Sequence, residues 1–445
     1  MSIASIEHTD GFADDRRAQW AARCTVPAEE LGRCVNVDEV IARYGEAAVR
    51  PIIDGYLTAD DLGREVLEDF AALPGATGRR MYQQALDHGI DSVDDPPASM
   101  VRLFELFDNR PAWVDDDQLR RGAVAYFRAG PMVSFALTCS VIAGSERAYG
   151  ISRPVAFTGR LADNAYGRAK ETTRWLVSAV RPGGMDRFSE GFKLTAQVRL
   201  VHAMTRKVIS RNANWDWDDW GMPISDADGL YAISYDFSRA MVDPLLKVGV
   251  RFSDGEIEDI YALWRYIGWV MGVPEHLLHR DATHARQLAD IYLALDPGAD
   301  DECRRLVRQL IELATQEGDV SLDVFPKVVT KLFPPLRLRK LLYGFTRYWA
   351  GDVVADQLGV PDTWHKHLPH LAKPAMGAME LGRRAGWVHD DRTCDATLRL
   401  LSAAAAAQAG EGTIVSVDEI AVDVEKNAPS FAGGRRGHHR RAAPR

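Results

Sequence analysis

The sequence predicts an all-α protein built as one large helical domain. Almost every segment with regularly spaced apolar residues follows the helical period, and alternating strand patterns bounded by hairpin turns are scarce. No repeat recurs at a fixed period, which disfavours a helical solenoid. A chain of 445 residues corresponds on average to about three domains, but one large helical domain can use the same length.

Six segments carry the helical pattern most clearly. In order along the chain they cover residues 62–72, 131–144, 160–180, 190–211, 253–272 and 301–315. The long apolar run at 131–144 is shorter than the roughly 20 residues that span a bilayer, so we expect a buried core helix there and no stable membrane span. In the fifth segment, Ser253 and Glu256 form a capping-box pattern, and Gly272 and Pro274 mark the end of the helix.

Clusters of turn residues at 91–99, 181–185 and 220–229 separate these helices. The alanine-rich stretch at 403–412 is expected to end the last well-formed helix, and residues 413–424 could form a short strand or helix. We therefore expect an N-terminal extension over 1–50, a helical domain over 51–400 with its core at about 100–290, and a C-terminal extension over 401–445.

The charge distribution argues against nucleic acid as a partner. The chain has a formal net charge of −9 and lacks the basic footprint that phosphate binding requires. Five arginines lie within the last eleven residues, in a Gly- and Pro-containing tail without an apolar period. We expect this basic tail to be disordered and solvated, with contact to an anion or RNA as the alternative.

The five cysteines are widely spread and form no C-x-x-C pair, so we expect reduced thiols and no covalently attached haem. The N-terminus has acids where an export signal needs basic residues followed by an apolar run. We therefore expect a cytoplasmic protein. P-loop, dinucleotide-binding, nucleophile-elbow and H-E-x-x-H motifs are all missing, which removes support for nucleotide-binding, hydrolase and zinc-protease functions.

His202 is the first candidate for chemistry. It lies on a helical face formed by Thr195, Val198, His202, Thr205 and Ile209, where it is the only titratable group. A neutral imidazole in an apolar setting can bind haem iron. The alternative is a hydrogen-bonded core histidine.

Arg168 and Thr172 are the second candidate. They lie four residues apart on a face that also carries Trp175 and Ala179, among apolar neighbours. A buried arginine needs a carboxylate, carbonyl groups or an anionic ligand. It could form a salt bridge with Asp163 or Glu171, or act as a pocket cation.

The segment 253–272 provides a third candidate. Gly268 and Gly272 lie four residues apart, where either another backbone or a flat cofactor could approach, and Arg265 lies nearby. The string WHKHLPH at 364–370 contains three histidines, but Pro369 interrupts any helix that would align them, so we expect no metal site there.

Three stretches lie at fixed mutual spacing: FTGRLADNAYGRAKETTRW, RPGGMDRFSEGFKLTAQVRLVHAMTRKVI and WDDWGMPISDADGLYAISYDFSRAMVDPLLKVGV. Together with the segment after them, they resemble the catalytic domain shared by MpaB-type oxygenases and latex clearing proteins. The resemblance is strong over roughly 100–290 and looser over 60–380. It implies a globin-like helical core that holds haem b.

The resemblance also implies roles for individual residues. The proximal haem ligand of latex clearing proteins is the histidine of an R-L-x-H-A motif, which is His202 here. The arginine and threonine on the distal side correspond to Arg168 and Thr172, which would donate hydrogen bonds to O2 or to a haem propionate. The distal lysine of that family corresponds to Glu171, with Lys170 one residue earlier, so a lysine ligand is not expected; Glu171 would be a distal base or a partner of Arg168.

The resemblance therefore implies a haem-dependent oxygenase that uses O2 to oxidise or cleave a small apolar substrate such as an alkene, an isoprenoid or a lipid. Arg265 is a further candidate for contact with the cofactor. Polyisoprene is not expected, because a polymer would require an exported enzyme. A haem-binding sensor or carrier without turnover is the alternative function, and a haem-free helical scaffold is the second alternative.

Overall fold

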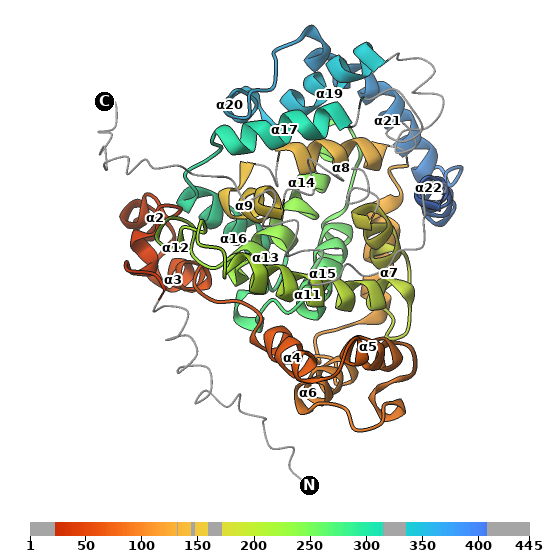
Figure 1. The fold of residues 1–445 in the computed structure, drawn as a ribbon. Helices are drawn as coiled ribbons and strands as arrows, with labels where there is room; N and C mark the ends of the chain where they lie inside the picture. Colours follow the sequence, from red (N-terminus) through yellow and green to blue (C-terminus); the bar gives the residue numbers. More distant parts are fainter. Residues whose placement is uncertain are drawn as a thin grey trace.

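Helices form the regular structure of this protein (Figure 1), and no strand occurs in the described part of the chain. The structure is a computed structural model that describes residues 23–130, 132–143, 147–158, 171–313, 315 and 335–406. The expected all-α fold is confirmed. The basic tail and residues 413–424, for which we made predictions, lie outside the described residues.

The first half of the chain contains α2 (Val37–Tyr44), α3 (Glu46–Gly55), α4 (Asp61–Ala72), α5 (Thr77–His88), α6 (Ala98–Asp108), α7 (Asp116–Phe127), α8 (Met132–Ala143) and α9 (Tyr149–Thr158). Residues 171–180 are also helical. The central part contains α11 (Glu190–Ile209), α12 (Trp217–Trp220), α13 (Asp226–Tyr231), the π-helical turn η4 (Ala232–Asp236), α14 (Arg239–Lys247), α15 (Asp254–Val270) and α16 (Ala282–Leu295). The last part contains α17 (Asp301–Leu313), α19 (Pro335–Ala350), α20 (Asp352–Gln357), α21 (Pro369–Arg384) and α22 (Asp390–Ala406). Short 3-10 helices cover Ala28–Glu30, Ile90–Ser92, Glu275–Leu277 and Trp364–His367.

The ends of the predicted helices agree with the structure to within two residues where the chain is described, but the predicted turn at 220–229 is wrong in its last part, where α13 begins at Asp226. At α15, the Ser253 hydroxyl accepts from the Glu256 N–H, and the Glu256 side chain accepts from the Ser253 N–H, so the predicted capping box is present. This helix ends at Val270, and Gly272 follows with a φ of +93° that favours glycine. The buried core helix expected at 131–144 is α8, in which Val133, Ala136 and Cys139 are buried.

The helices are arranged around one main core (Figure 1). Buried residues from α4 to α7, α11, α15, α22 and residues 171–180 form its largest cluster. A second cluster joins α2 and α3 to α13 and α16, so the N-terminal helices pack on the centre of the chain. Two smaller clusters contain α8 with α19, and α17 with α20.

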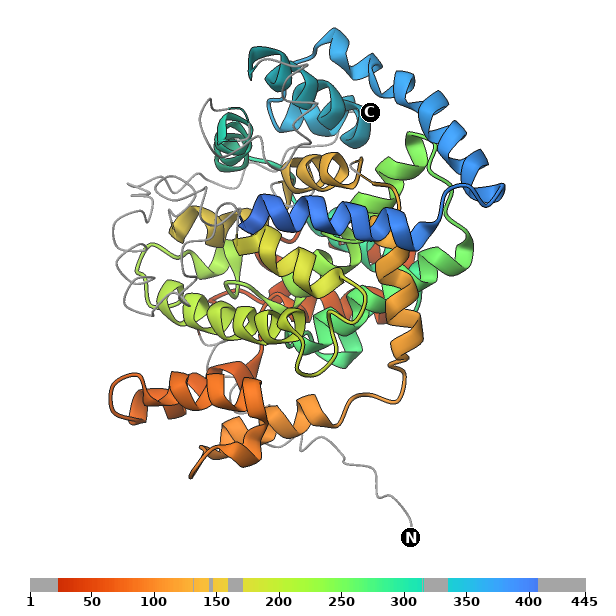
Figure 2. The same ribbon diagram turned by 90° about the vertical axis from the view of Figure 1, so that its right-hand side faces the viewer.

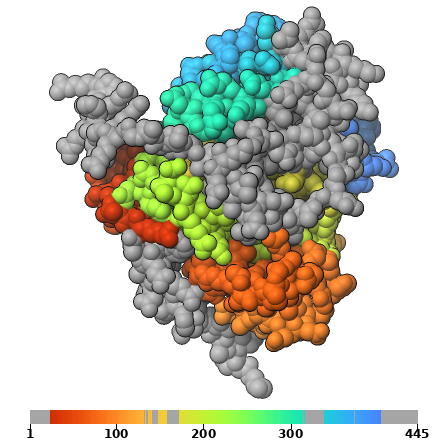
Figure 3. Space-filling model, viewed as in Figure 1, coloured from red at the N-terminus to blue at the C-terminus, as the bar shows by residue number. Residues whose placement is uncertain are grey.

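The views from other directions show how the outer helices cover this core. In Figure 2, α22 runs across the middle of the molecule and α21 follows its outer edge. In Figure 3, the orange segment that contains α4 and α5 lies along the lower edge of the visible face. Within the described ranges, we find no helix whose length and apolar content would suffice to traverse a bilayer.

Buried arginines tie the outer helices to the centre. Arg128, directly after α7, pairs with Glu256 at the start of α15 (2.7 Å) and with Glu380 of α21 (3.2 Å). Arg33 pairs with Asp228 of α13, and both side chains are almost fully buried. A buried ion pair is costly to break because one charge is left without its partner. These contacts therefore fix the frame within which α11 and α15 lie.

Candidate active site

Helix α11 carries the central candidate residue. The helix is 20 residues long, and the Ser189 hydroxyl accepts a hydrogen bond from the Phe192 N–H (3.3 Å) at its start. His202 lies in its second half and is half-buried. Thr195, Thr205 and Ile209 on the same face are buried. The imidazole therefore lies on a face of small and apolar residues, as predicted.

Several apolar residues of α11 are less buried than two of its arginines. Leu194, Val198, Val201 and Val208 are only half-buried, whereas Arg199 and Arg206 are buried. The reason is that both arginines have polar partners, which makes their burial tolerable. The two guanidinium groups that flank His202 in the sequence thus belong to the protein's internal contacts.

Arg199 makes a bidentate pair with Asp60, the residue that caps α4. Its Nε and Nη2 atoms donate to the two carboxylate oxygens of Asp60, each at 2.7 Å, and both side chains are nearly fully buried. Burial by itself would raise the pKa of Asp60, but the adjacent Arg199 guanidinium outweighs it and lowers that pKa. This pair fixes α11 against the start of α4, one turn before His202.

Arg206 has only carbonyl oxygens as described hydrogen-bond partners. It donates to the carbonyl oxygens of Pro223 (3.2 Å) and Ile224 (2.9 Å), and burial lowers the pKa of Arg206. Ile224 has a φ of +52°, which is rare for a β-branched residue. The loop before α13 therefore holds a strained conformation in which two carbonyls meet Arg206, one turn after His202.

An aromatic group lies near the N-terminal half of α11. The indole N–H of Trp175 donates to the hydroxyl of Thr195 (3.0 Å), which lies on the His202 face. Trp175 makes edge contacts with Phe237 and Trp264, whose rings stack at 5.0 Å. The Trp264 Nε1 atom is buried and has no hydrogen-bond acceptor among the described residues. An unpaired buried donor costs about 1–3 kcal/mol.

A second aromatic group lies near the C-terminal half of α11. Phe157 of α9, which packs on α11, contacts Trp215 and Trp220, and the two indoles contact each other at 5.0 Å. All three side chains are buried, and the Trp215 indole N–H donates to the Gly221 carbonyl (2.9 Å). One aromatic group thus contacts Thr195 on the His202 face, and the other joins α9 to the segment that follows α11.

The predicted distal residues are only partly described. Arg168 and Lys170 lie outside the described residues. Glu171 and Thr172 begin the helical stretch 171–180, and their side chains are exposed. Trp175 and Ala179 on the predicted apolar face are buried, as expected.

Gly268 of α15 and Gly272, just after this helix, serve packing. A side-chain carbon on Gly268 would lie 2.5 Å from Ile233 of η4, and one on Gly272 would lie 2.8 Å from both Arg199 and Asp60. Close approach by neighbouring side chains explains both glycines, as the packing alternative proposed. A flat cofactor is not needed to explain them.

Arg265 points to the loop before α7. Its guanidinium lies 3.8 Å from the centre of the Trp113 ring, and burial lowers the pKa of Arg265. The Nε atom of Arg265 has no hydrogen-bond acceptor among the described residues. The guanidinium can therefore still accept an anionic partner.

The other predicted features are found away from His202. His365 and His367 lie in a short 3-10 helix, and α21 begins at Pro369, so the three histidines of this string belong to two elements. The part of the chain that the structure describes contains no group of three or more His, Cys, Asp or Glu side chains placed to bind a metal. All five cysteines are free thiols.

Sequence reasoning missed the pair of Arg199 with Asp60 and the contact of Arg206 with the strained loop. The available signal was the spacing of the two arginines, because residues seven apart lie on the same helical face.

Comparison with known proteins gives a family and a fold. Residues 121–381 match the family model for the catalytic domain of the ER-bound oxygenase mpaB/B' and rubber oxygenase. The chain is similar to the structure of latex clearing protein LCP in the closed state, with a TM-score of 0.60, 17% identity, and coverage of 81% of this chain and 94% of that one. At this identity, the likeness establishes a shared helical fold. No curated protein sequence matches the chain.

Proposed function

Because the chain belongs to the family of mpaB and rubber oxygenase catalytic domains, we propose that it is a haem b-dependent oxygenase that acts with O2 on a small apolar substrate. In this proposal, His202 is the protein ligand of the haem iron. The observation that carries it is the position of one imidazole on an otherwise apolar face of α11, which also carries Thr195, the hydrogen-bond acceptor of Trp175.

The side chains that we propose for the site suit a haem. Neutral imidazole is a common protein ligand for haem iron, and aromatic side chains suit the faces of a flat apolar group. The Trp264 indole N–H and the Arg265 Nε atom are unpaired among the described residues, so each can donate to an acceptor that the group brings. We propose Arg265 as a cation for one of its propionates.

When bound, haem b supplies the iron at which O2 becomes reactive. The chain's own groups then have three tasks. His202 presents a neutral nitrogen lone pair, which must stay unprotonated. Thr172 and Arg168 are proposed to donate hydrogen bonds to the O2 reactant, and the carboxylate of Glu171 is proposed to hold a proton as a distal base. The aromatic groups exclude water and favour an apolar substrate.

Two contacts described above make His202 a well-positioned ligand. Arg199 fixes α11 one turn before it and Arg206 one turn after it. When a helix is fixed by contacts before and after the ligand residue, that residue loses little conformational entropy on binding iron. We expect the helix to keep its place whether or not the cofactor is bound.

The function is tested by incubating the haem-reconstituted protein with reductant, isotope-labelled O2 and a panel of small alkenes and isoprenoids. We expect mass spectrometry to detect a product that contains labelled oxygen. Arg168→Ala and Thr172→Ala should keep the Soret band while CO binding and product formation change; Arg174→Ala, an exposed arginine in the same helical stretch, is the control. A haem-loaded protein that forms no product with any substrate would contradict the oxygenase and leave a carrier or sensor.

A further inference from the structure

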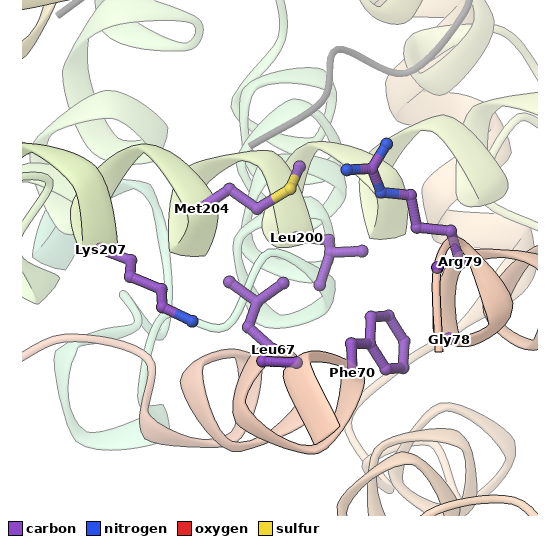
Figure 4. Close-up of a pocket in the computed structure, with 9 residues that line it drawn as sticks. Leu67, Phe70, Gly78, Arg79, Leu200, Met204 and Lys207 are labelled. Atoms are coloured by element: carbon purple, nitrogen blue, oxygen red, sulfur yellow. The ribbon is translucent and has the colours of Figure 1, made fainter. Parts of the chain in front are cut away.

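A cavity of about 280 Å³ lies between α4, α5 and α11 (Figure 4). At about 100° per residue, its α11 residues Leu200, Met204 and Lys207 lie roughly 150° around the helix from His202. The cavity is therefore on the opposite face of α11 from the proposed haem site. An occupant there would not be the substrate that reacts with O2.

The floor of the cavity is apolar. Leu67, Leu200 and Met204 are buried, and Phe70 is half-buried beside them. These side chains come from both α4 and α11, so the floor follows the line along which the two helices pack. Its volume is just below the roughly 300 Å³ at which small-molecule sites usually begin, which favours a small, slender occupant.

Two cations stand at opposite ends of this floor. Arg79 of α5 lies at one end and Lys207 of α11 at the other, as Figure 4 shows. Both side chains are half-buried, and the residues that line the cavity include no carboxylate. Among the described residues, neither cation forms an ion pair, whereas Lys193 and Arg199 of α11 each pair with an aspartate. The cavity thus combines apolar surface with uncompensated positive charge.

We propose that this cavity binds a linear aliphatic carboxylate, most tightly one with a carboxylate at each end. The hydrocarbon chain would lie on Leu67, Phe70 and Leu200, because apolar area removed from water stabilises the complex by roughly 25 cal/mol per Å². The terminal carboxylates would pair with Arg79 and Lys207. A guanidinium can hold a carboxylate through two parallel hydrogen bonds, and an ammonium group acts as a compact point charge.

The chemistry of the lining separates this ligand class from others. A phosphate or sulfate ion would satisfy the cations and leave the apolar floor exposed to water. A neutral alcohol or hydrocarbon of the same length would cover the floor but leave both cations without partners. The combination therefore predicts an order of affinity: dicarboxylate, then monocarboxylate, then neutral chain.

Isothermal titration calorimetry on the full chain tests this order with decanedioate, decanoate and decanol in low-salt buffer. We expect decanedioate to bind about fivefold more tightly than decanoate, since a solvent-accessible ion pair contributes up to about 1 kcal/mol. Decanol should bind more weakly still. Added salt should weaken the binding of decanedioate, because it screens the two charge pairs. Equal affinity for decanol and decanedioate would overturn the proposal.

Variants locate the site. Arg79→Gln and Lys207→Gln should each weaken decanedioate binding about fivefold, whereas Arg80→Gln, at an exposed neighbouring residue that does not line the cavity, should not change it. Ala71→Trp should fill the cavity and abolish binding, and Ala72→Trp, at the next exposed position, should leave it intact. Loss of binding in His202→Ala with normal binding in Arg79→Gln would place the ligand on the other face of α11 and contradict the proposal.

Discussion

Two histidines of this protein show two different environments. His279, just before α16, is 1% exposed, and both of its ring nitrogens have hydrogen-bond partners. Its Nε2–H donates to the Tyr261 carbonyl (2.8 Å), which leaves Nδ1 to accept from the Ser234 hydroxyl (3.2 Å). His202 on α11 is half-buried on an apolar face that also carries Thr195, the hydrogen-bond acceptor of Trp175.

The difference separates a structural histidine from a candidate ligand. His279 joins η4 to α15 and is enclosed by the protein, so its imidazole has no room for a further partner. His202 is less enclosed, and the helix that carries it is fixed by arginines on either side. The comparison predicts that His279 stabilises the fold and that His202 serves the cofactor.

The largest expected effect concerns the pair of Arg199 with Asp60, which fixes α11 against the start of α4. Arg199→Ala leaves the buried carboxylate of Asp60 without its partner, so we expect the free energy of unfolding to fall by about 3–5 kcal/mol. Urea denaturation monitored by circular dichroism measures this change in the free energy of unfolding. Asp61→Ala, at the exposed neighbour of Asp60, is the control and should change stability by about 0.5 kcal/mol or less. A small effect in both variants would mean that the pair does not fix α11.

The second effect is a pH dependence of the protein's stability that comes from His279. Burial lowers the pKa of His279 from 6.5 to about 4, so the unfolded chain binds a proton more readily between these values. The stability that this residue contributes is complete above pH 6.5 and is lost as the pH falls towards 4. Between pH 6.5 and 4, this shift in pKa lowers the free energy of unfolding by about 3 kcal/mol.

Urea denaturation of the wild type and His279→Gln at several pH values checks this prediction. The difference in unfolding free energy between the two proteins should shrink as the pH falls from 6.5 to 4. His88→Gln, at an exposed histidine, should show no such change. A difference that stays constant with pH would show that His279 is not buried in its neutral form.

The third effect is smaller and lies on the His202 face. Thr195→Val removes the acceptor of the buried Trp175 indole N–H, which should cost about 1–3 kcal/mol. Thr195→Ser keeps the hydroxyl and should restore most of the stability. A Thr195→Val variant that is as stable as the wild type would show that this hydrogen bond does not contribute to stability.

Local patterns predicted much of the fold. The apolar spacing of 62–72, 190–211 and 253–272 gave the helices α4, α11 and α15, and the Ser253 capping box appears in the structure as expected. These features depend on residues only three or four apart, which is the range that sequence periodicity records.

The contacts around the site depend on residues far apart in the chain. Asp60 and Arg199 are 139 residues apart, and Arg206 donates to the carbonyl of Ile224, 18 residues away. The sequence placed His202, Thr195 and Thr205 on one face, and the structure confirms this arrangement. The role of His202 as an iron ligand, and those of Arg168, Thr172, Glu171 and Arg265, stay predictions.

The absorption spectrum of haem-reconstituted His202→Ala tests the central proposal most directly. Wild type should show a haem b Soret band, and His202→Ala should lose it or weaken it strongly while its circular dichroism stays that of a folded helical protein. Added imidazole should restore part of the band, and Lys207→Ala, on the opposite face of α11, should keep it. A Soret band in His202→Ala that equals the wild-type band would contradict the account.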